Sequence, residues 1–259
     1  MTSTAMLTAA VAIAIFMIVM WVISLAMKNA SIVDIGWGIG FVIVAWAVRA
    51  RVEGNVDRQR LLVTMTTLWG LRLAVYLYAR NHGKGEDFRY KAMRKRWGPR
   101  FPLISLGTVF GVQGVLMWIV SLPVQLGQVE PTPKLGLLAW IGIVVWGIGF
   151  FFEVVGDAQL TRFKRDPANS GTVMDTGLWR YTRHPNYFGD ACVWWGIALV
   201  AAETAVGQWG LVGAAVMTIL LRRVSGVTLL EKSLIKRRTG YDAYVARTSP
   251  FVPRPPKRT

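Results

Sequence analysis

The sequence predicts an all-α, polytopic integral membrane protein with seven transmembrane helices, and three observations lead to this fold class. Hydrophobic residues make up 53% of the 259-residue chain and 12 residues are tryptophan, which is too apolar for a soluble domain of this size. Seven segments approach the roughly 20 apolar residues that cross the hydrocarbon core of a lipid bilayer. The connections between these segments carry most of the charged residues.

Each predicted span is an apolar run bounded by polar residues. The first is too long for the apolar core of a signal peptide and no small-residue cleavage site follows it, so it is interpreted as a retained span. Asp34 interrupts the second span and Asp190 opens the sixth. In chain order the spans are 5–27, 31–48, 61–79, 103–127, 135–156, 188–205 and 208–224.

The formal net charge of +16 reflects membrane topology rather than nucleic-acid binding, because arginine and lysine lie in loops and form no basic face of a soluble unit. The connections at 80–100 and 161–187 and the C-terminal segment from 222 are basic, whereas "QVEPTPK" and "ETAVGQ" are nearly neutral. The positive-inside rule therefore predicts an inner (cytoplasmic) membrane protein with an external N-terminus and a cytoplasmic C-terminus. The loop at 49–60 is an exception, since it is basic but falls outside.

Cys192 is the only cysteine and the chain has two histidines, so neither a disulfide framework nor a metal site is expected. The chain shows no internal repeat and no linker long enough to divide it. We therefore expect a single membrane domain over residues 1–259.

Several polar residues lie within or beside the spans, where a carboxylate costs about 2.5–3.5 kcal/mol on insertion scales. Asp34 has two interpretations, a functional group or an N-terminal helix residue favoured by the helix dipole. Glu153 and Asp157 stand one turn apart on one helix face, where two like charges repel, and we favour a functional site over pairing with the basic residues that follow. Tyr76 and Arg80 share a face of the third span and Tyr78 lies on another. Taken one at a time, they are interpreted as interfacial tyrosines and a snorkelling arginine, which are common at span ends.

The segment "GLWRYTRHPNYFGD", residues 177–190, combines a helix start at about Asn186, with Pro185 in the first turn, with Arg180, Arg183 and His184. Arginine binds phosphate through a planar fork of donors, and the free N–H groups of a helix N-terminus also attract anions. These residues predict a cytoplasmic pocket for a phosphate-bearing ligand. No dinucleotide-binding GxGxxG or P-loop pattern occurs, so a helical membrane pocket would hold the ligand.

This segment, together with "FFEVVGDAQLTRFKRDPANSG" and "GEDFRYKAMRKRWG", resembles the bacterial branch of the steroid 5α-reductase superfamily over about residues 34–253. The resemblance implies a seven-helix reductase that uses NADPH to reduce a carbon–carbon double bond conjugated to a carbonyl in a lipophilic small molecule. It places the NADPH-binding part mainly at 76–100 and 150–259. The implied cofactor-binding residues are Arg80, Arg89, Tyr90, Glu153, Asp157, Lys164, Tyr181, Arg183, His184, Asn186, Tyr187, Asp190 and Trp194.

The resemblance also implies a polarising tyrosine on the third span, for which Tyr76 is the best match and Tyr78 the alternative. Animal steroid reductases carry a Gln-Glu pair in span two where this chain has Val33-Asp34, so a steroid need not be the substrate. Our hypothesis assigns the stabilisation of the developing oxyanion to Tyr76 and to Asp34 kept protonated by apolar surroundings.

Two other classes of function stay open. Isoprenylcysteine and phospholipid methyltransferases carry a similar "RHPxYxG" and bind S-adenosylmethionine with it, so a membrane methyltransferase is the alternative. A transporter would explain buried carboxylates but not the dense basic site, and no inverted repeat is visible.

Overall fold

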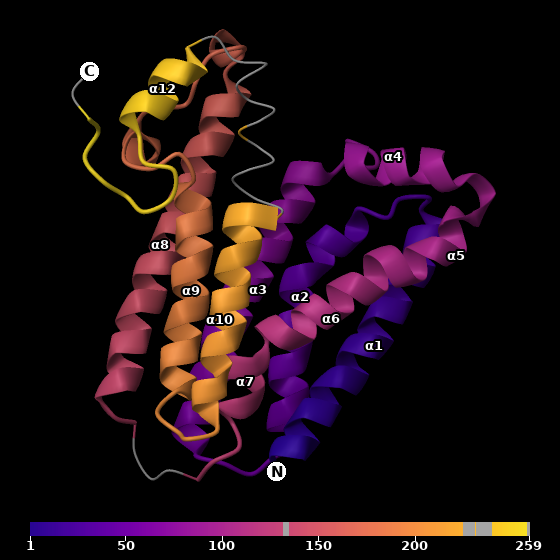
Figure 1. Ribbon diagram of the computed structural model, residues 1–259, viewed down its shortest axis with the longest axis vertical. Coiled ribbons are helices and arrows are strands. Elements are labelled where there is room, and N and C mark those ends of the chain that lie inside the picture. The colour runs from indigo at the N-terminus through magenta and orange to yellow at the C-terminus, as the bar shows by residue number, and fades with distance from the viewer. Residues whose placement is uncertain (132–134, 225–230, 232–239, 258–259) are drawn as a thin grey trace. The chain divides into compact units, whose positions relative to one another are not determined.

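The computed structural model describes residues 1–131, 135–224, 231 and 240–257 (Figure 1). Over these ranges the regular elements are helices, and an isolated β-bridge joins Thr182 to Ser249. The predicted all-α class is confirmed for this part of the chain. Two predicted features fall partly outside it: the loop "QVEPTPK" includes residues 132–134, and the cofactor region 150–259 includes 225–230, 232–239 and 258–259.

Five helices among the described residues are long and apolar enough to cross a membrane, which supports a multi-pass membrane protein in a lipid bilayer. They are α1 (Thr2–Ala26), α2 (Ile32–Arg49), α3 (Val56–Asn81), the helical run Phe88–Val120, and α8 (Leu137–Arg165). The last two predicted spans correspond to α9 (Pro185–Ala201) and to α10 (Leu211–Ile219), which continues as the π-helical turn Leu220–Val224. Both are shorter than the five, so the count of seven stays a prediction.

The helical run Phe88–Val120 is divided into several elements by its sequence. α4 (Phe88–Trp97) is polar, and Gly98 with φ of 52° ends it. The turn Gly98–Arg100 leads into α5 (Phe101–Ser105), the π-helix η2 (Leu106–Gly111) and α6 (Val112–Val120). α7 (Leu122–Leu126) then begins with Pro123 in its first turn. Backbone N–H groups in the first turn have no partner within the helix, so the missing N–H of proline costs no helical hydrogen bond there. In Figure 1, α4 runs across the direction of α1, α2 and α3.

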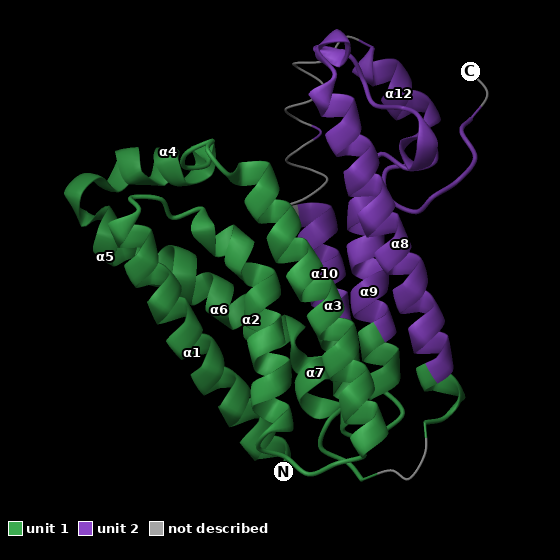
Figure 2. Cartoon of the chain, turned by 180° about the vertical axis from the view of Figure 1, so that it is seen from behind, with its two compact units in different colours: residues 1–139, 197–213 green, residues 140–196, 214–259 purple. Residues whose placement is uncertain are grey.

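Close contacts divide the described chain into two compact units, shown in Figure 2. Unit 1 comprises Met1–Ala139 and Ile197–Gly213, and unit 2 comprises Trp140–Gly196 and Ala214–Thr259. The boundaries fall inside α8, α9 and α10. The single membrane domain expected from the sequence stays a prediction.

A buried polar group holds one end of unit 1 together. Arg58, fully buried near the start of α3, lies 3.4 Å from the carboxylate of Glu203. The same carboxylate accepts hydrogen bonds of 3.0 Å from the backbone N–H groups of Gly136 and Ala139, at the start of α8. The exceptional basic loop at 49–60 thus gives one of its cations to an internal ion pair, and its exposed positive charge is lower than its sequence indicates.

In unit 2, glycines let α8 and α9 approach closely. Gly142, Gly149 and Gly156 are spaced by seven residues along α8 and therefore share one face. A Cβ atom at Gly149 would lie 2.5 Å from the carbonyl oxygen of Gly189, and one at Gly196 would lie 2.6 Å from that of Gly142. The backbones touch where these glycines meet, which brings the polar residues between them into one buried layer.

Candidate functional site

Unit 1 contains a hydrogen-bonded cluster around Asp34, in the first turn of α2. The Tyr90 hydroxyl donates a 2.8 Å hydrogen bond to Oδ1 of Asp34, and Nη2 of Arg89 donates one of 2.8 Å to Oδ2. Nε2 of Gln113 donates to the Tyr90 oxygen at 3.1 Å, and Trp37 donates its indole N–H to Gln113. We call Asp34, Arg89, Tyr90 and Gln113 the Asp34 cluster. Both oxygens of its carboxyl group act as acceptors.

The sequence "GED" builds this cluster by fixing the start of α4. Asp87 caps the helix, since its side chain accepts a 3.0 Å hydrogen bond from the backbone N–H of Arg89. The same oxygen accepts a second hydrogen bond, of 2.9 Å, from Nε of Arg89. Glu86 accepts 2.8 Å bonds from the Ala30 backbone N–H and from Arg94. Burial favours the neutral carboxyl groups, but these hydrogen bonds outweigh it and lower the pKa of both Glu86 and Asp87.

Tyr76, half-buried on α3, lies between two cations. The guanidinium groups of Arg72 and Arg80 lie 5.3 and 5.6 Å from the centre of its ring, within cation–π range. The Tyr78 ring is 56% exposed and lies 5.2 Å from the His82 ring. The two tyrosines therefore face different surroundings, as the helical period predicts.

Unit 2 contains a second buried group, the α8–α9 cluster of Glu153, Asp157, Asn186 and Asp190. Glu153 and Asp157 are only 3% and 4% exposed, and Asp190 is 8% exposed. Nδ2 of Asn186 donates a 3.1 Å hydrogen bond to Oδ1 of Asp157, and Trp194 is fully buried one turn beyond Asp190. Three carboxyl groups so deep in a helix pair are costly unless hydrogen-bond donors meet them.

The residues before α9 form an ion-pair network centred on Glu231. Arg183 donates to its two carboxylate oxygens at 2.7 and 3.1 Å, and Nη1 of Arg183 donates to the carbonyls of Val245 and Thr248. His184 Nε2 lies 3.1 Å from Oε1 of Glu231. Burial opposes ionisation of Glu231, but the bonds from His184 and Arg183 prevail and lower its pKa. Arg183 therefore connects the C-terminal segment to the start of α9 through hydrogen bonds.

A family model described as "Protein of unknown function (DUF1295)" matches residues 20–248, which include both clusters and Glu231. The chain belongs to the DUF1295 family. This family is associated with steroid 5α-reductase-like membrane proteins. An uncharacterized protein of Schizosaccharomyces pombe is 26% identical over 274 aligned positions, which cover 91% of this chain and 76% of that protein. No solved structure matches this chain significantly.

In this DUF1295 protein the residues singled out from the sequence are divided between the two compact units. Asp34, Arg89 and Tyr90 meet in unit 1, where Tyr76 also contacts Arg80. Unit 2 holds the other predicted residues, which are Glu153, Asp157, Lys164, Tyr181, Arg183, His184, Asn186, Tyr187, Asp190 and Trp194. Among them Lys164 and Tyr181 are exposed, and the Tyr187 ring stacks on His184 with centroids 5.5 Å apart.

Sequence reasoning missed three residues of these networks. Gln113 was the detectable one, because an amide in the apolar run "FGVQGVLMW" needs a partner just as a carboxylate does. Trp37 and Glu231 gave no such signal, since tryptophan is common in spans and Glu231 stands in a charged segment.

Proposed function

We propose that this chain is an NADPH-dependent membrane reductase that saturates a carbon–carbon double bond conjugated to a carbonyl group in a lipophilic substrate. The family association and the resemblance to steroid 5α-reductases support this class of reaction. The single observation that carries the proposal is the α8–α9 cluster. Its buried carboxyl groups and the Asn186 amide offer the acceptors and donors that ribose hydroxyls and a nicotinamide amide require in a dry site.

The cations before α9 fit the remaining part of the cofactor. Arg180 and Tyr181 are exposed, and we assign them, together with Lys164, to the phosphate groups. Arg183 is engaged with Glu231 and two carbonyl groups, and we assign it the positioning of this segment. Asn186, Asp190 and Trp194 are assigned to the nicotinamide and its ribose.

NADPH supplies the hydride in this proposal, and the protein supplies position and electrostatics. Negative charge grows on the carbonyl oxygen as hydride reaches the β-carbon, so donors aimed at that oxygen lower the barrier. We assign this role to the Tyr76 hydroxyl, whose ring two guanidinium groups flank. The second donor expected from the sequence, a protonated Asp34, stays a prediction. The contacts of its carboxyl group also assign Asp34 to the orientation of Tyr90 and Arg89.

A binding experiment tests the function. Purified protein is titrated with NADPH and, separately, with S-adenosylmethionine, and mass spectrometry identifies any nucleotide that co-purifies. We expect NADPH to bind, and Asn186→Ala or Asp190→Ala to weaken it by roughly 5- to 150-fold, because each removes a partner from a desolvated polar group at about 1–3 kcal/mol. Binding of S-adenosylmethionine alone would support the methyltransferase alternative and reject the reductase.

We also propose that α9 and α10 complete seven spans in the inner membrane, with the N-terminus outside and the C-terminus in the cytoplasm. The loop charges support this orientation, and the Arg58–Glu203 pair removes part of the conflict posed by the loop at 49–60. A reporter fused after Thr259 should be cytoplasmic and one in "QVEPTPK" external. Both reporters on one side would reject the seven-span topology.

A further inference from the structure

Three exposed cations and a tryptophan lie where α4 turns into α5. Lys95, Arg96 and Arg100, which we call the cationic corner, are all exposed on α4 and the turn that follows it. Trp97 between them is 40% exposed, and the Arg96 guanidinium lies 5.4 Å from its ring. An exposed tryptophan beside cations is typical of the headgroup level of a bilayer.

The acidic residues at the start of α4 are already engaged with other groups. Glu86 accepts from Arg94 and the Ala30 backbone, and Asp87 accepts from Arg89. Within the described part of the chain, none of the ion pairs includes a residue of the cationic corner. The corner therefore presents three uncompensated positive charges.

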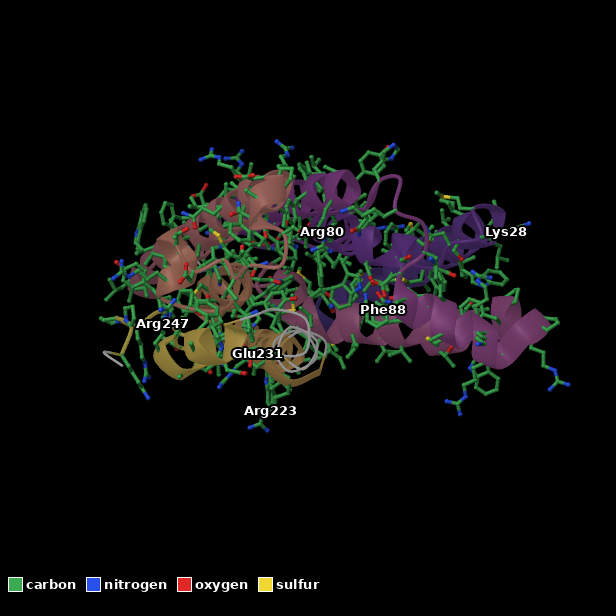
Figure 3. The ribbon with its side chains drawn as sticks, turned by 90° about the horizontal axis from the view of Figure 1, so that it is seen from above. Lys28, Arg80, Phe88, Arg223, Glu231 and Arg247 are labelled. Carbon is green, nitrogen blue, oxygen red and sulfur yellow. The ribbon has the colours of Figure 1, made fainter. Side chains whose placement is uncertain are left out.

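A hydrogen bond fixes the depth of this corner relative to α1. The indole N–H of Trp21 donates to the carbonyl oxygen of Pro102 at 2.9 Å, so the last turns of α1 lie beside the start of α5. The apolar sequence of α1 ends five residues after Trp21, at Ala26, and the exposed Lys28 follows (Figure 3). Arg100 stands two residues before Pro102 and therefore lies on the side of this contact that faces the polar end of α1.

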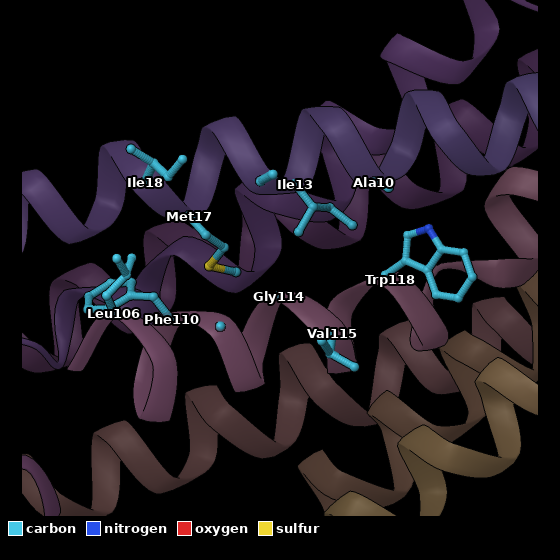
Figure 4. A pocket seen from close by; sticks show the side chains of 11 residues that line it. Ala10, Ile13, Met17, Ile18, Leu106, Phe110, Gly114, Val115 and Trp118 are labelled. Atoms are coloured by element: carbon cyan, nitrogen blue, oxygen red, sulfur yellow. The ribbon is translucent and has the colours of Figure 1, made fainter. Parts of the chain in front are cut away.

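Directly below the Trp21–Pro102 contact, an apolar groove of about 480 Å³ runs between α1 and the η2–α6 helix (Figure 4). It begins at Ile18 and Leu106, about one turn from Trp21 and Pro102, and extends to Trp118. Its lining includes the small residues Ala14 and Gly114, which leave space between the larger apolar side chains of the two facing helices.

We propose that the cationic corner and this groove form one binding site for an anionic bilayer phospholipid. The phosphate group lies against Arg96 and Arg100, whose planar donors match phosphate oxygens, and one acyl chain lies in the groove. The charge of the corner selects an anionic headgroup, and the apolar lining fits a hydrocarbon chain. This inference concerns unit 1 alone and does not depend on the proposed reductase activity.

The test measures which lipids the full-length protein retains. Protein reconstituted in equal amounts of phosphatidylglycerol and phosphatidylcholine is purified in a neutral detergent, and the bound lipid is quantified by mass spectrometry. Wild type should retain phosphatidylglycerol preferentially, and increasing salt should reduce this preference because exposed charges are screened. Arg96→Gln with Arg100→Gln should lower phosphatidylglycerol affinity by roughly 10- to 30-fold, at about 1 kcal/mol for each cation.

Two further variants define the site. Ala14→Phe fills the groove and should reduce retention of phosphatidylglycerol without changing the surface charge. Arg51→Gln with Lys84→Gln removes two exposed cations elsewhere in unit 1 and should leave retention unchanged. Gel filtration of each variant checks that it is folded. Equal retention in wild type, the corner variant and the groove variant overturns the proposal, as does displacement of the lipid by progesterone, which would make the groove a substrate site.

Discussion

The Tyr90 hydroxyl donates a 2.8 Å hydrogen bond to Oδ1 of Asp34 and so joins α4 to the first turn of α2. Tyr90 is only 6% exposed, and its oxygen in turn accepts from Gln113 on α6 at 3.1 Å. One hydroxyl group therefore connects three helices of unit 1.

Replacing Tyr90 with Phe removes this connection and should destabilise unit 1. The change leaves the Gln113 amide and one oxygen of Asp34 without the Tyr90 hydroxyl. An unsatisfied buried polar group lowers the free energy of unfolding by about 1–3 kcal/mol. We expect the thermal unfolding midpoint in detergent to fall by roughly 2–8 °C. Tyr78→Phe is the matched control, because Tyr78 is 56% exposed, and it should unfold like wild type. Equal midpoints for all three proteins would show that the Asp34 cluster does not stabilise the fold.

The proposed chemistry predicts a different outcome at Tyr76. Tyr76→Phe should leave NADPH binding nearly intact and lower the rate of enone reduction, because its hydroxyl stabilises charge that develops mainly in the transition state. Loss of one such donor costs roughly a hundredfold to a thousandfold. Single-turnover oxidation of NADPH with progesterone, or with simpler enones if progesterone is inert, measures the rate.

Tyr78→Phe serves as the control here as well. A variant series in which Tyr78→Phe is inactive and Tyr76→Phe matches wild type would move the polarising role to Tyr78. If both variants match wild type on a substrate that the enzyme reduces, no tyrosine of α3 polarises the carbonyl.

The packing of α8 on α9 predicts that two nearby glycines differ in their tolerance of a side chain. Gly149→Val places a Cβ atom 2.5 Å from the Gly189 carbonyl oxygen, so the helices must separate. Gly147→Val meets nothing within 4 Å. We expect Gly149→Val to lower the free energy of unfolding by about 1–3 kcal/mol or to prevent folding. Gly147→Val should have an unfolding midpoint close to that of wild type in the same detergent. Similar losses for both would mean that valine acts through helix propensity and not through the contact with Gly189.

The network at Glu231 predicts how stability depends on pH. The pKa of Glu231 in the folded protein lies below its ordinary value of 4.5, so the group adds stability above that pH and loses it as the pH falls through the folded pKa. Glu231→Gln removes the ionised partner of Arg183. The difference in unfolding midpoint between wild type and Glu231→Gln should therefore be largest near pH 7 and should narrow below about pH 4.5. A difference that stays constant with pH would contradict the ion pair.

Much of the candidate site could be located from the sequence, because a polar residue in an apolar run is visible without a structure. Asp34, Glu153, Asp157 and Asp190 all stood out in this way, and all four lie in the two clusters. Gln113 had the same signal. The partners of these residues could not be found from the sequence, since several donors of suitable type lie on other helices.

Arg183 illustrates where local reasoning stops. A planar guanidinium before a helix N-terminus indicates an anion site, and the prediction of a phosphate contact followed from this. In the folded chain the anion beside Arg183 is the Glu231 carboxylate, 48 residues later. A carboxylate is an anion of the general kind that the local pattern indicates, and the contact of Arg183 with a phosphate group stays a prediction.

The sequence by itself determined the all-helical class and the multi-pass membrane character, because the length and composition of an apolar run are properties of consecutive residues. It also located the start of α9 to within one residue, at about Asn186 where the helix begins at Pro185, since a first-turn proline acts locally. Only the tertiary structure decided that Asp34 meets Tyr90, 56 residues away, and that Asn186 meets Asp157. Such pairs depend on which helix faces pack together, and that choice follows from contacts such as Gly149 with Gly189, where the absence of a side chain allows two backbones to touch.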